Sequence, residues 1–200
     1  MLTLKKIAIT GGVASGKSSV CRFFEELGAY VVNADALVHK LLTPDTDLGQ
    51  QIIRLFGLSV GSDGKISRRI IAEKVFKDAA LLEKLEKLLH PAVLDKIEEL
   101  YAEASKRGNH SSFVVEIPLL FEIGSEGFYD VIVAVLADEA IARKRFEQAG
   151  FQTEEYDRRM RRQIKPHQKA LRAHYTLINN GSLEDLRKQV IALNQTIQNS

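Results

Sequence analysis

Cysteine is almost absent from this chain of 200 residues, and the only one, Cys21, cannot close a disulfide within the molecule. The sequence has no CxxC or Cys/His spacing that would suit a structural zinc ion, so we expect a reducing compartment. Long apolar runs are missing too. No segment approaches the roughly 18 apolar residues that span a bilayer, and the amino-terminal run is too short for a signal peptide. These absences predict a cytoplasmic protein with no membrane partner.

A strong excess of charge is also lacking, because 28 basic residues face 26 acidic ones and the formal net charge is +2. Bulk electrostatics therefore gives no reason to bind nucleic acid, and we expect none as a partner. Arginines do gather locally, at residues 143–145 and 158–162, but acidic residues are interleaved with them. This cluster indicates either a solvated helix face or a local site that screens phosphate charge.

Short apolar runs alternate along the chain with stretches of helical periodicity. We expect strands at residues 5–10, 30–33, 113–117, 131–136 and 175–178. Helices are expected at residues 18–27 and, after Ser182 as the N-cap, at residues 183–197. Continuous apolar strands indicate a parallel sheet that is covered on both faces. The predicted fold class is α/β, with three α/β/α layers around a sheet of about five strands.

Nearly eighty residues separate the second and third expected strands, which is more than one crossover helix needs. A turn at residues 57–64 is expected to open an insertion, and a leucine-rich helical face is expected to end near His90–Pro91. We therefore expect residues 1–200 to form one domain in three parts. These are a core of residues 1–57, 109–137 and 167–200, a helical substrate subdomain at 58–108, and a lid at 138–166.

Residues 11–18, GGVASGKS, fit the pattern G-x-x-x-x-G-K-[ST] and lie between an expected strand and an expected helix, as a phosphate-binding loop requires. Glycines allow backbone N–H groups to converge on a phosphate, and the following helix adds the positive end of its dipole. Lys17 is predicted to reach the β- and γ-phosphates, and Ser18 to bind Mg²⁺. ATP and Mg²⁺ are the expected cofactors. The predicted nucleotide-binding residues here are Gly12, Val13, Ala14, Ser15, Gly16, Lys17, Ser18 and Ser19.

The phosphate loop alone does not separate a small-molecule kinase from a GTPase switch or a mechanical ATPase. The sequence has no [NT]-K-x-D guanine signature. A mechanical ATPase normally has an acidic residue at the end of a later strand. Glu116 and Asp130 are imperfect candidates for that residue. Small size, a helical insertion and the arginine-rich segment favour a kinase that closes over its substrate. Another small-molecule kinase and a nucleotide-dependent binding switch remain the alternatives.

Further short motifs follow over nearly the whole chain. They are TGGVASGKS at 10–18, Leu27–Gly28, VNAD at 32–35, Pro44, Phe56–Gly57, Asp63–Gly64, Arg68, Val75–Phe76, His90–Pro91, IPLLFE at 117–122 and INNG at 178–181. In order and approximate spacing they resemble the dephospho-CoA kinase family. The resemblance implies that ATP phosphorylates the ribose 3′-hydroxyl of dephospho-CoA, giving CoA and ADP in the last step of CoA biosynthesis. We expect a monomer or a weak homo-oligomer.

The resemblance also implies site residues. Asp35 takes the second acidic position of the family's D-A-D pattern and is the candidate general base, while its alternative role is to cap the next helix. Lys17 is the other expected catalytic residue. Arg145, Asn180 and Gly181 are implied at the nucleotide. Substrate contacts are implied for Thr10, Asp35, His39, Arg68, Leu119, Leu120, Phe121 and Arg159. For Leu119 and Leu120, ordinary core packing is the alternative.

The chain departs from the family pattern at three positions. Asn33 replaces the first acid of D-A-D, so a carboxylate contact to metal is in doubt there. Ala149 stands where a second lid arginine is usual, and Ser67 replaces the aspartate before Arg68. The change at Ser67 weakens any capping role expected at that position.

Overall fold

The computed structural model describes residues 4–62 and 65–199. The described chain forms two compact units, one of residues up to 32 together with those from 103 onward, and one of residues 33–102. Most of the expected insertion at 58–108 lies in the second unit, which also includes residues 33–57. The Asp63–Gly64 motif lies outside the described residues.

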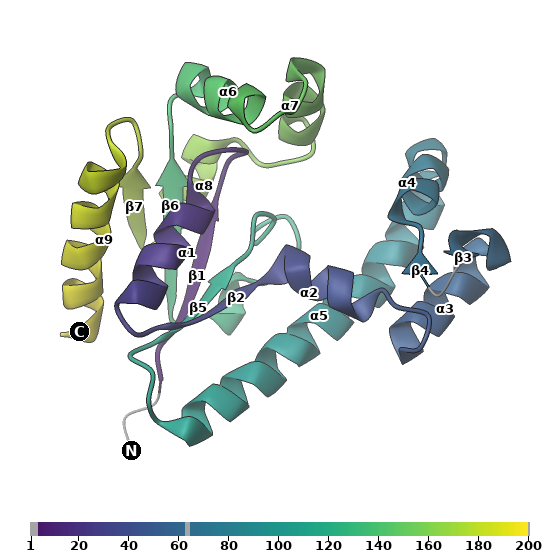
Figure 1. Cartoon of the computed structure of the whole chain (residues 1–200), viewed down its shortest axis with the longest axis horizontal. Helices are drawn as coiled ribbons and strands as arrows, with labels where there is room; N and C mark the ends of the chain where they lie inside the picture. Colours follow the sequence, from purple (N-terminus) through teal and green to yellow (C-terminus); the bar gives the residue numbers. More distant parts are fainter. Residues whose placement is uncertain (1–3, 63–64, 200) are drawn as a thin grey trace. The chain divides into compact units, whose positions relative to one another are not determined.

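The first unit is built on a five-stranded sheet with the strand order β2-β5-β1-β6-β7 (Figure 1). The strands are β1 (Lys6–Gly11), β2 (Tyr30–Asn33), β5 (Phe113–Glu116), β6 (Val131–Leu136) and β7 (Tyr175–Ile178). The central strand β1 pairs in parallel with β5 and β6, and β6 pairs in parallel with β7. The predicted strands and the parallel α/β class are confirmed, with differences of one residue at the ends of β1 and β5.

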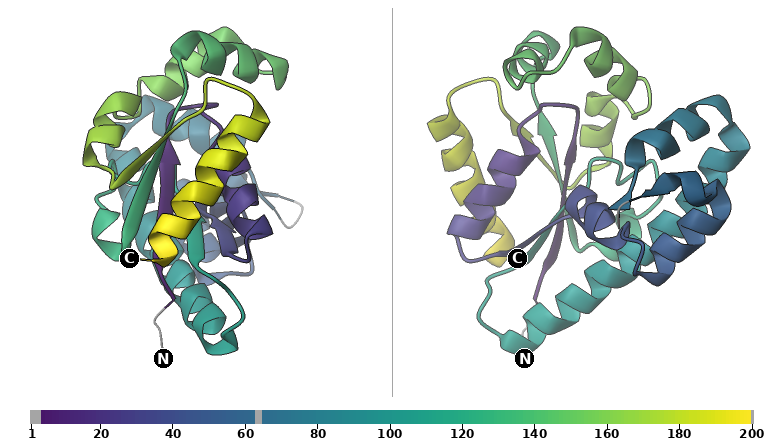
Figure 2. Two further views of the ribbon diagram at one scale, coloured as in Figure 1. Left: turned by 90° about the vertical axis from the view of Figure 1, so that its left-hand side faces the viewer. Right: turned by 45° about the vertical axis from the view of Figure 1, so that its right-hand side comes forward.

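Helices cover both faces of this sheet, which explains why its central strands are apolar along their whole length. All residues of β1 and β5 are buried. On one face, α1 (Lys17–Glu26) packs beside α9 (Leu183–Gln198), as the views in Figure 2 also show. On the other face, α8 (Pro166–Arg172) packs against β6 and β1. The predicted cap of α9 is confirmed, because the Ser182 side chain accepts the N–H of Asp185.

The expected lid segment contains two helices of the first unit, α6 (Glu139–Gln148) and α7 (Thr153–Met160). They share a small apolar cluster in which Ala142, Phe146 and Tyr156 are buried together with Val13 of the phosphate loop. The segment therefore has a hydrophobic core of its own, and the phosphate loop contributes to it. A short 3₁₀ helix, η2 (Glu126–Phe128), precedes β6.

The second unit is mainly helical. Its elements are α2 (Ala34–Leu41), α3 (Asp47–Phe56), the 3₁₀ helix η1 (Leu58–Val60), the short antiparallel pair β3 (Gly61–Ser62) and β4 (Lys65–Ile66), α4 (Arg68–Lys77) and the long helix α5 (Ala79–Arg107), which continues into the first unit. A second apolar cluster, with Ile52, Phe56 and Val60 near its centre, joins these elements. In the described part of the chain, no helix has the length and apolar character needed to cross a membrane.

The expected end of a helix near His90–Pro91 is wrong. α5 runs without a break from Ala79 to Arg107 and carries Pro91 inside it. Proline in a helix interior normally costs about 3 kcal/mol, through a lost hydrogen bond and a steric clash. Here, Leu85, Leu88, Leu89 and Ala92 all belong to the apolar cluster of the second unit, so packing on both sides of the proline keeps the helix intact.

Candidate active site

The phosphate loop connects β1 to α1, and its backbone takes conformations that few residue types tolerate. Gly16 has φ +101° and Ala14 has φ +52°, both in the left-handed region. Gly11 approaches β6 so closely that a Cβ atom there would lie 2.3 Å from the carbonyl oxygen of Val135. The loop is therefore shaped by contact with the central strands and presents the amino terminus of α1 as a site for anions.

Lys17 is buried at the start of α1 and turns back over the loop. Its ammonium donates to the carbonyl oxygen of Gly12 at 2.7 Å and to that of Gly11 at 3.3 Å. The positive charge is thus held directly at the loop that would receive the phosphates.

Ser18 and Glu116 come together beside this loop. The Ser18 hydroxyl donates to Oε1 of Glu116 at 3.0 Å, and Glu116 is buried at the carboxyl end of β5. A hydroxyl and a carboxylate oxygen are hard ligands of the kind that Mg²⁺ binds together with substrate phosphates. The residues present therefore fit a magnesium site. Glu116 was only an imperfect candidate in the sequence, although an acid that ends an apolar strand was a signal that could have identified it.

Asp130, the other acidic candidate, lies away from this constellation. Its carboxylate accepts the backbone N–H of Lys6 at 2.8 Å, at the beginning of β1, and it precedes β6. In a parallel sheet the strands begin at the edge opposite the phosphate loop. Asp130 therefore has a structural role at the far end of the sheet.

The segments that follow β6 and β7 are joined by hydrogen bonds. Arg145, on α6, donates to the backbone oxygen of Asn179 at 2.9 Å. The Asn180 side chain accepts the backbone N–H of Asp138 at 2.8 Å. The structure thus brings two of the predicted nucleotide residues, Arg145 and Asn180, to the same pair of loops.

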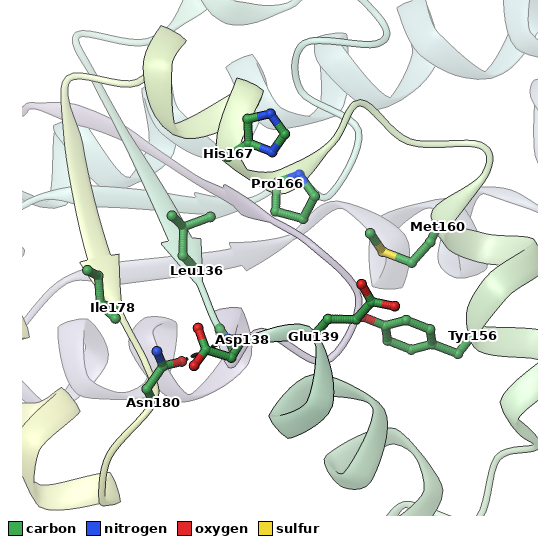
Figure 3. Close-up of a pocket in the computed structure, with 10 residues that line it drawn as sticks. Leu136, Asp138, Glu139, Tyr156, Met160, Pro166, His167, Ile178 and Asn180 are labelled. Atoms are coloured by element: carbon green, nitrogen blue, oxygen red, sulfur yellow. Dashed lines mark hydrogen bonds between the residues drawn. The ribbon is translucent and has the colours of Figure 1, made fainter.

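A pocket of about 310 Å³ opens between these loops and the lid segment (Figure 3). In Figure 3, Asn180 and Asp138 face one another on one side, while Tyr156 and Met160 lie on the other. Met160 and Pro166 also lie against the phosphate loop, because a Cβ atom on Gly12 would be 2.9 Å from Pro166 Cγ. An adjacent recess of about 610 Å³ includes the cationic residues Arg143, Arg161 and Lys165.

Two arginines of the expected lid segment form their contacts within that segment. Arg143 bonds Asp157 at 2.5 Å and Glu139 at 2.7 Å, and its guanidinium lies over the ring of Tyr156. The bonds to Asp157 and then to Glu139 raise the pKa of Arg143 above its usual value. Arg159, an expected substrate contact, pairs with Glu155 and lies over two phenylalanine rings. A role of Arg159 at the substrate remains a prediction.

Within the helical unit, the structure brings together two of the residues implied at the substrate. The side chains of His39, in the last turn of α2, and Arg68, at the start of α4, are hydrogen-bonded. Ser67 caps α4 by accepting the N–H of Ile70, so the doubt about capping at that position is removed. Together the histidine and the arginine form a polar pair suited to an anionic ligand.

Asp35 is exposed in the first turn of α2, but it does not cap that helix. The cap is Asn33, whose side chain accepts the N–H of Ala36 at 2.8 Å. The alternative role considered for Asp35 is therefore wrong, and its carboxylate is available for another one. Asn33 thus has a structural role as a helix cap, which an aspartate could also perform.

The segment after β5 is mostly buried. Leu120 and Thr10 have no exposed surface, Phe121 is 6% exposed, and Leu119 is 39% exposed. The Thr10 hydroxyl donates to the carbonyl oxygen of Pro118 at 3.3 Å. Of these four predicted substrate contacts, Leu119 alone is exposed, and the burial of Leu120 favours its alternative role in core packing. All four contacts remain predictions.

A buried ion pair that the sequence did not reveal holds this segment to α8. Lys169 has no exposed surface, and its ammonium lies 2.8 Å from Glu122 Oε1 and 2.5 Å from the carbonyl oxygen of Pro118. Burial lowers the pKa of Lys169, against the raising effect of Glu122. Glu122 also accepts the backbone N–H of Ile164 at 2.8 Å, so the pair connects three separate segments.

Comparison with known proteins agrees with the phosphate-binding loop and the fold described above. A family model described as Dephospho-CoA kinase matches residues 5–185. A dephospho-CoA kinase of Protochlamydia amoebophila is 44% identical over 200 residues, covering 99% of this chain and 98% of the relative.

Two solved structures resemble the chain over almost its whole length. A crystal structure of a Thermus thermophilus protein covers 97% of this chain and 98% of its own, with 33% identity and a TM-score of 0.81. A dephospho-CoA kinase from Campylobacter jejuni covers 97% of both chains, with 27% identity and a TM-score of 0.72. With the phosphate loop, Lys17 and the Ser18–Glu116 pair in place, these matches show that the chain belongs to the dephospho-CoA kinase family.

Proposed function

We propose that this protein transfers the γ-phosphate of ATP to the ribose 3′-hydroxyl of dephospho-CoA, releasing CoA and ADP. The observation that carries the proposal is the phosphate loop with Lys17 folded over it and Ser18 bonded to Glu116. Membership of the family, over residues 5–185, supports dephospho-CoA as the acceptor.

Binding of ATP is expected to change the contacts of Lys17. In the structure its ammonium donates to two loop carbonyl oxygens, and phosphate oxygens of greater negative charge would compete for those protons. The backbone N–H groups at the start of α1 would bind the β-phosphate. Ser18 and Glu116 would hold Mg²⁺, which neutralises charge on the β- and γ-phosphate oxygens when bound.

Asp35 is the proposed general base. It follows β2 in the chain and takes the second acidic position of the family's pattern. An exposed carboxylate there can accept, or orient, the proton of the attacking hydroxyl, an effect worth roughly 10²- to 10⁴-fold in rate. The His39–Arg68 pair is proposed to bind an anionic group of the acceptor, while Arg145, Asn180 and Gly181 are proposed to contact the nucleotide.

The proposal is tested by measuring ADP release from purified protein with Mg-ATP, in the presence and absence of dephospho-CoA. Lys17→Ala serves as the inactive background. Acceptor-dependent ADP release supports the kinase. Equal release without acceptor, or ATP binding without turnover, would favour a nucleotide-dependent switch, whereas turnover with a different hydroxyl compound would favour another small-molecule kinase.

The role of Asp35 needs its own matched control. Asp47 occupies the first turn of α3, as Asp35 does in α2, and it is also exposed. Asp35→Asn should reduce kcat by about 10²-fold or more with little change in the affinity for ATP, and Asp47→Asn should leave kcat unchanged. Equal kcat values for the two variants would remove Asp35 from the mechanism.

A further inference from the structure

Asn179, immediately after β7, forms hydrogen bonds to both the phosphate loop and helix α6. It is 6% exposed. Its side-chain nitrogen donates to the carbonyl oxygen of Ser15 at 2.8 Å, and its side-chain oxygen accepts from Arg145 at 3.3 Å. Its backbone oxygen accepts a second bond from Arg145 at 2.9 Å. One small side chain thus contacts both the phosphate loop and α6.

The chemistry of the two partners fixes the orientation of this amide. A carbonyl oxygen can only accept a hydrogen bond, and a guanidinium can only donate. The nitrogen must therefore face Ser15 and the oxygen must face Arg145. The asparagine side chain carries both the donor that Ser15 needs and the acceptor that Arg145 needs. An aspartate of the same shape would present only acceptors to Ser15.

Asn179 also occupies the space beside Gly16, the second glycine of the G-x-x-x-x-G-K-[ST] motif. A Cβ atom built on Gly16 would lie 2.1 Å from the Asn179 side-chain nitrogen. Gly16 itself has φ +101°, a conformation that favours glycine. The Asn179 side chain therefore occupies the space that a side chain at position 16 would need, and it lies against the loop that would bind phosphate.

We propose that Asn179 is a positioning residue for the nucleotide: it fixes the phosphate loop at Ser15 and Gly16 and holds Arg145 of α6 in place beside it. Through these contacts it couples the geometry of the phosphate loop to the arginine proposed to contact ATP. The inference rests on the proposed binding of ATP in this loop, but it is independent of which acceptor is phosphorylated.

The first test measures ATP affinity by calorimetry, without acceptor, for the wild type, Asn179→Ala and Asn179→Asp. Loss of the bond to Ser15 should weaken ATP binding at least about tenfold in both variants, which corresponds to one hydrogen bond of ordinary net strength. Asn179→Asp keeps the shape and the acceptor for Arg145. It removes the donor to Ser15 and adds a negative charge, whereas Asn179→Ala removes the same donor without a charge. Comparable losses of affinity in the two variants would therefore trace the effect to the lost bond with Ser15.

A matched control separates positioning from general destabilisation of the end of β7. The Gln189 side chain bonds both the backbone N–H and the carbonyl oxygen of Ile178, at 3.1 and 2.9 Å. Gln189→Ala should therefore lower the melting temperature while leaving the affinity for ATP unchanged. If Asn179→Ala and Asn179→Asp behave in the same way, the role of Asn179 is merely structural and the inference is wrong.

Two further measurements sharpen the outcome. In steady-state kinetics, Asn179→Ala should raise KM for ATP about tenfold and change KM for dephospho-CoA less than twofold. Arg145→Ala alone should weaken ATP binding. In the Asn179→Ala background the same change should weaken ATP binding little further, because the two residues act together. Additive losses would contradict the coupling. If the wild type itself does not bind ATP, the proposed function fails, and not only this inference.

Discussion

Replacing Lys169 by methionine is expected to be among the most destabilising single changes in the first unit. The ammonium is fully buried between Glu122 and the carbonyl oxygen of Pro118. Methionine has a similar length but no charge and no donor, so the substitution leaves the Glu122 carboxylate, which is 15% exposed, without its cation. The second Glu122 oxygen is already buried and has no hydrogen-bond partner among the described residues.

The magnitude follows from the unpaired charge. Breaking a buried ion pair by removing one partner typically costs about 3–5 kcal/mol, because the remaining charge is uncompensated. For a chain of 200 residues, each kcal/mol lowers the melting temperature by roughly 2–4 °C. Lys169→Met should therefore melt about 6–20 °C below the wild type.

Urea denaturation followed by circular dichroism measures the free energy of unfolding directly. Lys165→Met, at an exposed lysine that precedes the same helix, is the matched control and should change the stability by less than about 0.5 kcal/mol. The double variant Lys169→Met/Glu122→Leu should recover part of the loss, because no buried charge is then left unpaired. A loss below about 1 kcal/mol for Lys169→Met, or no recovery in the double variant, would refute this reasoning.

Other predictions concern the nucleotide site and the helix ends. Gly16→Ala should abolish ATP binding in calorimetry, because its Cβ atom would lie 2.1 Å from Asn179, and retained affinity would contradict the shape of the loop. Glu116→Gln should raise the Mg²⁺ concentration needed for half-maximal turnover, and an unchanged value would exclude Glu116 from the metal site. Hydrogen bonds from Ser182 lower the pKa of Asp185 below 3.8, so its contribution to stability is present above that value and is lost as the pH falls through the lowered pKa. The stability difference between wild type and Asp185→Asn should accordingly vanish at the lowest pH, and a constant difference would argue against the capping box.

Much of the first unit was predictable from the sequence because its strands carry their own signals. β6 and β7 are short apolar runs bounded by turns, and their predicted limits match the structure. The phosphate loop was equally clear, since its glycines are required by local backbone geometry at Gly11 and Gly16. Such local constraints can be read without knowing which elements pack together.

Other features depend on tertiary contacts and were missed for that reason. Pro91 is a helix breaker by local propensity, yet packing of its neighbours keeps α5 continuous. Lys169 looks like any other residue of a basic segment, and its burial follows only from the position of α8 against the sheet. The contacts of Asn179 could not be predicted for the same reason, because their partner Ser15 lies far from it in the sequence.

The position of the new phosphate in the product is the most direct test of the proposed reaction. After incubation with Mg-ATP and dephospho-CoA, two-dimensional ³¹P–¹H NMR of the purified product should show the new phosphorus coupled to the ribose H3′, and this product should be absent with Lys17→Ala. Coupling to H2′, or no acceptor-dependent product at all, would contradict the proposed function.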